Sequence, residues 1–339
     1  MNILLTSAGR RSYLVEYFKS EIGQGQIHVS NISPVSSAFT VADKHVISPL
    51  IYDPGYIDFL LKYCKENCID ALIALLDMDL LVLAKNRKRF EDIGVRLIVS
   101  DEQVIEICND KWNTYQFLKE KGFDAPKTYI DLNEALEALD TGVITYPVIV
   151  KPRWGMASIA VYTANNRREL KGLYKKIQEE IFETVLKYES DQNRDACVLI
   201  QQMLQGQEYG LDVINDLEGN YRTTIVKKKI AMRSGETDCA MTVKDENIAK
   251  VGEQLSKAMG HIANLDTDIF VDGEKIYILE MNARFGGGYP FSHVAGVNLP
   301  KAIIRWLQGK TVSEDCFAYR ETMGMKDLRI VELKDMCKD

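Results

Sequence analysis

Short apolar runs alternate with amphipathic stretches through residues 1–105, and this alternation constrains the fold more than any other feature. A run that is apolar on both faces is typical of a parallel strand that helices cover on each side. Strands and helices that alternate at this spacing indicate βαβ units. The expected strands are Asn2–Thr6, His28–Ile32, Ile69–Leu76 and Val95–Ser100. We therefore expect residues 1–108 to form an open parallel α/β domain.

The pattern changes after residue 108, where shorter strands mix with helices. Residues 109–204 predict a small α+β unit, with a long charged helix over Arg167–Lys187 and an exposed polar loop over Glu189–Asp195. Residues 205–339 predict antiparallel hairpins. Their expected strands are Tyr209–Asn215 with Tyr221–Lys229, and Asp268–Val271 with Lys275–Met281. The chain is thus predicted to be α/β and α+β in three parts.

Composition excludes several classes of protein. The 339 residues carry 42 Lys and Arg against 49 Asp and Glu, so the net charge of −7 gives no general attraction to nucleic acid or to an anionic membrane. No apolar run reaches the roughly 18 residues of a membrane span, and the N-terminus does not resemble a signal peptide. Seven cysteines without a secretion signal are expected to be reduced thiols. We expect a cytoplasmic protein with neither nucleic-acid nor membrane partners.

Several common catalytic motifs are absent from the sequence. The first strand is followed by Gly9 alone rather than by a dinucleotide-binding glycine fingerprint. The tripeptide Gly309-Lys310-Thr311 lacks the upstream glycine of a P-loop and follows a helix, so it is interpreted as a helix end. No Gly-x-Ser-x-Gly elbow occurs, and the four histidines lack zinc spacing.

The segment Ile278–Gly288 carries the clearest chemistry. In a strand, Glu280, Asn282 and Arg284 point to one face because side chains alternate. Carboxylate and amide oxygens suit Mg²⁺, which usually takes one or two protein carboxylates, and Arg284 adds charge for a phosphate. Asp268, on the paired hairpin strand, is expected to complete the metal site. The alternative is a strand with an ordinary polar, exposed face.

Two lysines are candidates for phosphate contacts. Lys151 ends the apolar strand that begins near Tyr146, and such a lysine can direct its ammonium into a cleft. Lys111 follows Asn109-Asp110 at the start of a helix, and alone it would be a weak signal because surface lysines are common.

Together these segments resemble the ATP-grasp superfamily, in particular the synthetase domains of the carbamoyl-phosphate synthase large subunit. The resemblance spans about residues 1–305 in the family's order. It rests on four segments: Asp110–Thr128, Tyr146–Pro152, Gln201–Tyr209 and Glu280–Arg284. An N-terminal domain carrying Ala42-Asp43-Lys44 and Leu75-Leu76-Asp77 fits as well. The resemblance implies an ATP-grasp fold behind a parallel α/β domain.

The resemblance also implies roles for individual residues. Those expected to bind ATP are Lys111, Lys151, Ser158, Gln202, Met203, Leu204 and Glu208. Asp268, Glu280 and Asn282 would bind Mg²⁺, with Mn²⁺ as an alternative, and Arg284 would face the transferred phosphoryl group or the acyl phosphate. The loop after Lys151 keeps one glycine where the family usually has more, so closure of residues 152–158 as a lid is an open question.

Members of the family activate a carboxylate as an acyl phosphate and join it to an amine. Such chemistry needs positioning and charge neutralisation rather than a protein nucleophile. The basic run Lys227–Arg233 offers Lys228, Lys229 and Arg233 to the substrate carboxylate, against the alternative of a solvated strand. Arg10 and Arg11, after the first strand, are candidates for the second substrate, and Asp77 for its ammonium.

We therefore predict an ADP-forming carboxylate–amine ligase that acts on small molecules, with a homodimer plausible. Two alternatives remain. One is a bicarbonate-phosphorylating enzyme like carbamoyl-phosphate synthase, and the other is a nucleotide-binding regulatory module without turnover.

Overall fold

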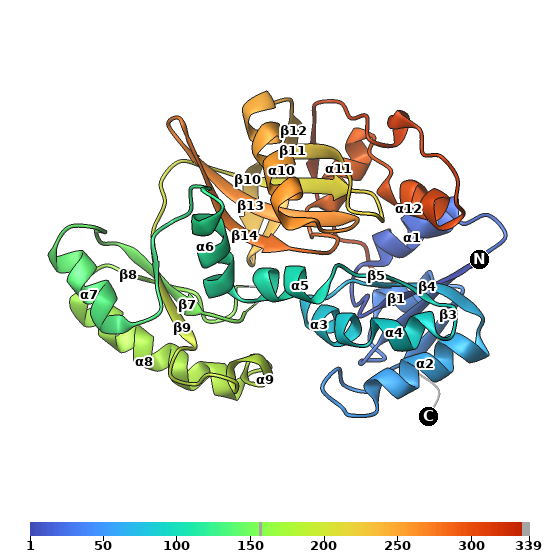
Figure 1. The fold of residues 1–339 in the computed structure, drawn as a ribbon, viewed down its shortest axis with the longest axis horizontal. Helices are drawn as coiled ribbons and strands as arrows, with labels where there is room; N and C mark the ends of the chain where they lie inside the picture. Colours follow the sequence, from blue (N-terminus) through green and yellow to red (C-terminus); the bar gives the residue numbers. More distant parts are fainter. Residues whose placement is uncertain (156–157, 334–339) are drawn as a thin grey trace.

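The computed structural model describes residues 1–155 and 158–333. Figure 1 shows three bodies: a parallel sheet with helices at the lower right, a small sheet with its helices at the left, and a large antiparallel sheet at the top.

The N-terminal body is an open parallel sheet of order β3-β2-β1-β4-β5, which confirms the α/β prediction. Ile3, Leu4 and Leu5 of the central strand are buried because helices cover the sheet. Its strands are β1 (Asn2–Thr6), β2 (Gln26–Asn31), β3 (Lys44–Ile47), β4 (Ile69–Ala74) and β5 (Arg96–Ile98). Its helices are α1 (Ser12–Glu21), η1 (Ser37–Thr40), α2 (Tyr56–Glu66), α3 (Asp77–Lys85), α4 (Arg87–Glu91) and α5 (Glu102–Asn109).

The strand order places a crevice beside β1. β1 is paired with β2 on one side and β4 on the other, and Thr6 is in register with Ala74 at their carboxyl ends. In open α/β sheets, ligands bind at this reversal of strand order. The segments that follow these two strands carry Arg11 and Asp77, so the backbone of both residues lies at the crevice.

The small sheet has the order β6-β9-β7-β8 and is antiparallel. Helices α7 and α8 pack on it, and their buried residues belong to a core of its own. The elements from this part of the chain are α6 (Lys111–Glu120), β6 (Thr128–Tyr129), α7 (Leu132–Asp140), β7 (Val148–Pro152), β8 (Tyr162–Ala164), α8 (Arg167–Glu183), α9 (Lys187–Ser190) and β9 (Val198–Gln202).

The large sheet has the order β14-β13-β10-β11-β12-β15, with every neighbouring pair antiparallel. Both expected hairpins are present, as β10–β11 and β13–β14. The elements are β10 (Gln207–Asn215), β11 (Tyr221–Arg233), β12 (Glu236–Val243), α10 (Glu246–Met259), β13 (Asn264–Asp272), β14 (Lys275–Asn282), α11 (Tyr289–Ala295), α12 (Leu299–Leu307), η2 (Glu314–Cys316) and β15 (Thr322–Met325).

The large sheet and the N-terminal body share their cores. Leu4 and Leu60 lie in one apolar cluster with Leu211 and Leu265 of the large sheet. Helix α6 joins this cluster through Leu118, although the sequence places α6 at the start of the small unit. The small sheet is therefore the part with the most independent packing.

Two local predictions in the small unit are wrong in part. The helix expected over 167–187 ends at Glu183 and restarts as α9, because Thr184 is extended and its hydroxyl bonds to the carbonyl of Ile181 and accepts from the amide of Leu186. The segment expected to be an exposed loop, 189–195, begins inside α9 with Ser190 buried, and it is exposed from Asp191 onward. Within the described residues, no helix combines the length and apolar character needed to cross a bilayer.

Candidate active site

A cleft of about 670 Å³ lies between the small sheet, the large sheet and the carboxyl edge of the N-terminal sheet. All but three of the predicted site residues line it. Those residues are Asp77, Lys111, Lys151, Ser158, Gln202, Met203, Leu204, Glu208, Lys229, Asp268, Glu280, Asn282 and Arg284. Segments far apart in the chain are thus brought to one place.

The two predicted phosphate lysines reach the cleft from different elements. Lys111 begins α6, donates to the carbonyl oxygen of Gly155, and has its Nζ 3.5 Å from Oε1 of Glu280. Lys151 is buried in β7, and its Nζ donates to Oε1 of Gln201 at 2.8 Å. Burial lowers the pKa of Lys151 to about 8. Lys151 is therefore a cation that a nearby phosphate would stabilise.

An ion pair aligns the segments that carry these lysines. The Asp110 carboxylate caps α6 by accepting from the amides of Trp112 and Asn113. It also accepts from Arg153, at 2.8 Å from Nε and 2.7 Å from Nη2, and both side chains are largely buried. Sequence reasoning did not identify Arg153. The pair fixes the first turn of α6 to the loop that follows β7.

The predicted metal ligands form one group across the β13–β14 hairpin. Asp268 is in register with Glu280, and Asp266 with Asn282, as the spacing predicted for Asp268. Burial and the neighbouring Asp266 and Glu280 carboxylates raise the pKa of Asp268 to about 6, although Lys229 opposes the shift. Burial alone would raise the pKa of Glu280, but the ammonium groups of Lys111 and Lys151 outweigh burial and lower that pKa. Charge of this density suits a divalent cation.

The donor set fits Mg²⁺ together with a nucleotide. Among the described residues, no three His, Cys, Asp or Glu side chains form a metal site by themselves. Asp268 and Glu280 supply two carboxylates, and Asn282 adds an amide oxygen from the same end of the hairpin. Mg²⁺ usually takes only one or two protein carboxylates and completes its shell with phosphate and water oxygens.

The predicted nucleotide hinge follows β9. The amide of Gln202 donates to the carbonyl of Lys127 at 2.8 Å, and Met203 and Leu204 then line the cleft. Glu208 lies further along, at the start of β10. Ser158 also lines the cleft, while residues 156 and 157 of the predicted lid lie outside the described residues.

Arg284 lines the cleft and lies between two carboxylates. Its Nη2 is 2.9 Å from Oδ2 of Asp77, and its Nη1 is 3.0 Å from Oδ2 of Asp266. These carboxylates raise the pKa of Arg284 against the opposing effect of burial. Its Nε is buried and has no hydrogen-bond partner among the described residues. The guanidinium is thus held rigidly by the Asp77 and Asp266 carboxylates and by the carbonyl of Phe285.

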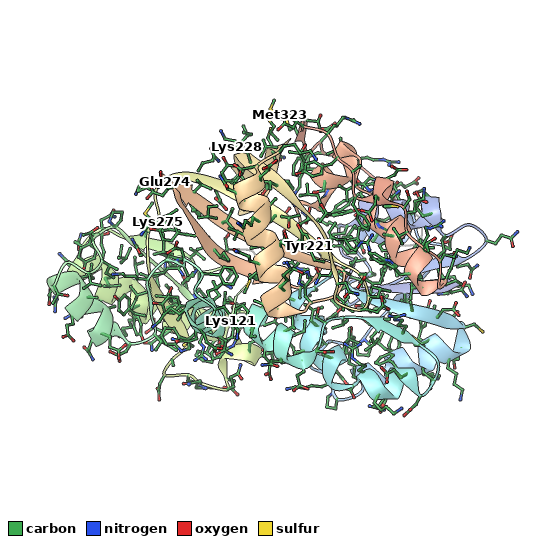
Figure 2. All side chains as sticks on the ribbon, turned by 45° about the horizontal axis from the view of Figure 1, so that its top comes forward. Lys121, Tyr221, Lys228, Glu274, Lys275 and Met323 are labelled. Atoms are coloured by element: carbon green, nitrogen blue, oxygen red, sulfur yellow. The ribbon has the colours of Figure 1, made fainter. Side chains whose placement is uncertain are left out.

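Three predicted substrate residues do not reach the cleft. Lys228 points to the other face of β11, the face that carries its register partners Met241 and Met323, because adjacent strand residues alternate (Figure 2). Arg233 pairs with Asp238 at 2.6 Å and is half exposed. Arg10 is exposed. Lys228 and Arg233 therefore do not supply the cation expected for the substrate carboxylate, and Arg10 does not reach the second substrate's expected place in the cleft.

The cleft instead contains residues that sequence reasoning missed or only grouped with others. Arg11 lines it and donates to the carbonyls of Leu75 and Phe285. Lys227 lines it as well, but it forms a buried ion pair with Asp212. Asp266 shares strand parity with Asp268, and that alternation was the signal that would have found it.

Comparison with known proteins agrees with this geometry. The profile of the ATP-grasp domain matches residues 108–288, which is more than half of the chain. The chain belongs to the ATP-grasp family. A second profile, for the PylC-like N-terminal domain, matches residues 3–98. The resemblance inferred from the motifs and the fold class are both confirmed.

Curated relatives of this ATP-grasp chain include carbamoyl phosphate synthase large chains. That of Pseudothermotoga lettingae is 22% identical over 86% of this chain and 25% of its own length. That of Campylobacter jejuni is 27% identical over 65% of this chain and 20% of its own length. The chain therefore spans about a quarter, or less, of the length of these relatives.

Solved ATP-grasp structures share the fold. The L-amino acid ligase of Bacillus licheniformis has a TM-score of 0.70 and 18% identity, over 91% of this chain and 75% of its own. The biotin carboxylase domain dimer of Hydrogenobacter thermophilus, a complex with MgADP, ADP and bicarbonate, has a TM-score of 0.72 and 19% identity, over 93% and 71%. Enzymes of this family are ADP-forming ligases.

Proposed function

We propose that this chain is an ATP-dependent ligase that phosphorylates a carboxylate and joins the resulting acyl group to an amine. The observation that carries the proposal is the single cleft in which Lys111, Lys151, Glu280 and Arg284 face one another from separate parts of the chain. A module that only senses nucleotide does not need this combination of cations and carboxylates.

The nucleotide would lie along the sheets with its phosphates toward the two lysines. The backbone around Gln202–Leu204 would receive the adenine edge and Glu208 the ribose hydroxyls. Lys111 and Lys151 would neutralise phosphate charge, which favours the protonated form of Lys151 despite its burial. Asp268, Glu280 and Asn282 would hold Mg²⁺, and the bound ion neutralises charge on the transferred phosphoryl group.

Arg284 would receive the substrate end of the reaction. Its guanidinium is fixed by Asp77 and Asp266, so it would meet the transferred phosphoryl group or the acyl phosphate with little reorganisation. Arg11 reaches the cleft from the N-terminal crevice. Burial, and after it the neighbouring Arg284 guanidinium, lower the pKa of Arg11. Arg11 and Arg284 are the cleft-lining guanidinium groups that would meet the carboxylate of the substrate.

The chemistry proceeds in two displacements. A carboxylate oxygen attacks the γ-phosphorus of ATP, and the bond to the β,γ-bridging oxygen breaks to release ADP. The amine nitrogen then attacks the acyl carbon, and the carbon–oxygen bond breaks with its electron pair to release phosphate. Two protons leave an incoming ammonium, one to phosphate and one to solvent. The protein's part is to position groups and neutralise charge.

Bicarbonate is a second candidate for the carboxylate. The relatives named carbamoyl phosphate synthase and the neighbour bound to bicarbonate favour including it.

A homodimer is likewise a proposal for this chain.

Release of ADP from MgATP across amino acids, small carboxylates and bicarbonate, each with and without amines, tests the function. Release that depends on a carboxylate and an amine supports the ligase. Release with bicarbonate alone favours the second candidate, and nucleotide binding without turnover on any substrate would favour the regulatory module.

A further inference from the structure

Lys229 bridges two carboxylates that belong to different predicted subsites. Its Nζ lies 2.6 Å from Oε1 of Glu208, the proposed ribose ligand, and 2.7 Å from Oδ1 of Asp268, the proposed metal ligand. The Lys229 side chain is 8% exposed. It therefore has no freedom to bind a substrate carboxylate while both contacts persist, contrary to the role suggested by its place in the basic run.

The bridge has room because Gly210 lies beneath it. A Cβ atom at Gly210 would lie 3.5 Å from Cε of Lys229 and 3.7 Å from Oδ1 of Asp268. A longer side chain at this position would fill the space that the lysine and the carboxylate share. The local sequence thus leaves a gap in which a cation meets Asp268.

Two neighbouring carboxylates of the cleft have cations other than Lys229 as partners. Glu280 is next to Lys111, and Asp266 is bound by Arg284. Lys227, the adjacent cleft-facing lysine of β11, is bound by Asp212. Within the described residues, Lys229 is therefore the cation in direct contact with Asp268.

We infer that the Lys229 ammonium is a built-in counter-ion that competes with a divalent cation for Asp268. While Lys229 stays on Asp268, a free metal ion must displace one positive charge to bind. A metal–nucleotide complex brings phosphates that can accept the displaced ammonium, so it binds without leaving that charge unpartnered. The inference takes Asp268 as a metal ligand from the proposed function, and it adds that metal and nucleotide enter together.

Binding of free Mn²⁺ without nucleotide, followed by electron paramagnetic resonance on the full chain, tests this role. Lys229→Met removes the charge at similar length and is expected to bind Mn²⁺ at least about tenfold more tightly than the wild type, a shift of 1.4 kcal/mol. Lys228→Met is the matched control, because Lys228 points to the opposite face of the same strand, and its Mn²⁺ affinity is expected to be unchanged. Adding Asp268→Asn to Lys229→Met is expected to abolish the gain.

A second variant keeps the test decisive if Lys229→Met does not fold. Lys229→Gln retains a donor for Glu208 and is expected to bind Mn²⁺ more tightly as well, with a larger Mn²⁺-induced rise in melting temperature than the wild type. If a folded Lys229 variant binds Mn²⁺ no more tightly than the wild type does, the inference is overturned. This measurement needs no turnover, so a chain without ligase activity can still support the counter-ion role of Lys229. Conversely, an active ligase whose Lys229 variants bind Mn²⁺ with unchanged affinity would refute the counter-ion role and leave the proposed function standing.

Discussion

Lys111 Nζ lies 3.5 Å from Glu280 Oε1, so the first turn of α6 and the strand β14 meet at the wall of the cleft. Glu280 is also close enough to Lys151 for that lysine to help lower its pKa. One carboxylate therefore organises both proposed phosphate lysines as well as the proposed metal. This arrangement leads to the first prediction.

Glu280→Gln is expected to reduce turnover by at least about 10²-fold while the fold is retained, because the amide removes the negative charge that would hold the proposed metal and that faces both lysines. Steady-state ADP release and circular dichroism measure the two effects. Glu274→Gln makes the same chemical change in the exposed β13–β14 turn and is expected to be neutral. Full activity in Glu280→Gln would refute the metal assignment.

Nucleotide affinity is expected to fall as pH rises through about 8, because the free protein loses the Lys151 charge there instead of at the ordinary pKa of 10.5. The same shift makes this lysine's contribution to stability rise between pH 8 and 10.5, where the unfolded chain keeps a proton that the folded chain has released. ATP titrations between pH 7 and 10 measure the affinity. Lys151→Arg stays charged and is expected to remove the inflection, and an identical profile in both proteins would contradict the assignment.

Arg153→Met is expected to destabilise the chain by roughly 3–5 kcal/mol, because it leaves the buried Asp110 carboxylate without its cation. It is also expected to weaken ATP binding, since Asp110 caps the helix that presents Lys111. Arg194→Met breaks an exposed pair with Asp191 and is expected to cost at most about 1 kcal/mol. Denaturant unfolding compares the two variants, and equal losses in the free energy of unfolding would argue against a stabilising role for the Asp110–Arg153 pair.

The small unit touches the N-terminal body through Tyr52. Its hydroxyl donates to Oε1 of Glu189 at 2.9 Å, and its ring stacks on Tyr188 with 4.2 Å between centroids. Tyr52→Phe removes only the hydrogen bond. Because the contact holds the small unit to the N-terminal body and the nucleotide would lie between these parts, the change is expected to speed nucleotide release by roughly 5-fold, equivalent to about 1 kcal/mol. Tyr52→Ala removes the stack as well and is expected to act more strongly. Stopped-flow release of a fluorescent nucleotide checks both, and a wild-type rate for Tyr52→Ala would show that this contact does not hold the parts together.

Gly286 packs tightly against the carboxylate that orients Arg284. A Cβ at Gly286 would lie 2.1 Å from Oδ1 of Asp266, whereas one at Gly287 would meet nothing closer than 3.8 Å. Gly286→Ala is therefore expected to displace Asp266, lower the melting temperature and reduce activity. Gly287→Ala is expected to retain wild-type stability, and the reverse order in thermal unfolding would contradict the packing.

The fold was predictable where the periodicity of apolar residues was strong. The buried strands β1 and β4 and the two hairpins of the large sheet follow directly from that pattern. Strands β3 and β15 did not, because their residues are mostly exposed and their pairing with β2 and β12 is tertiary. The break in α8 depends on a single threonine that bonds to its own backbone.

The candidate site was predictable where one short segment carries the chemistry. Glu280 and Asn282 share strand parity in β14, and Asp268 lies opposite Glu280, as predicted, whereas Arg284 follows after the strand has ended. The error at Lys228 arose because a basic run does not say which of its members face the cleft. The pairs Asp110–Arg153 and Tyr52–Glu189 join distant segments, so local sequence gives no signal for them.

The most direct test of the central claim follows one oxygen atom through the reaction. The carboxylate that gives the highest ADP release is labelled with ¹⁸O in both oxygens, and the released phosphate is analysed by mass spectrometry. An acyl phosphate intermediate predicts one ¹⁸O in each phosphate formed together with the amide, because cleavage breaks the bond between carbon and the labelled oxygen. Unlabelled phosphate formed in step with amide would contradict the account.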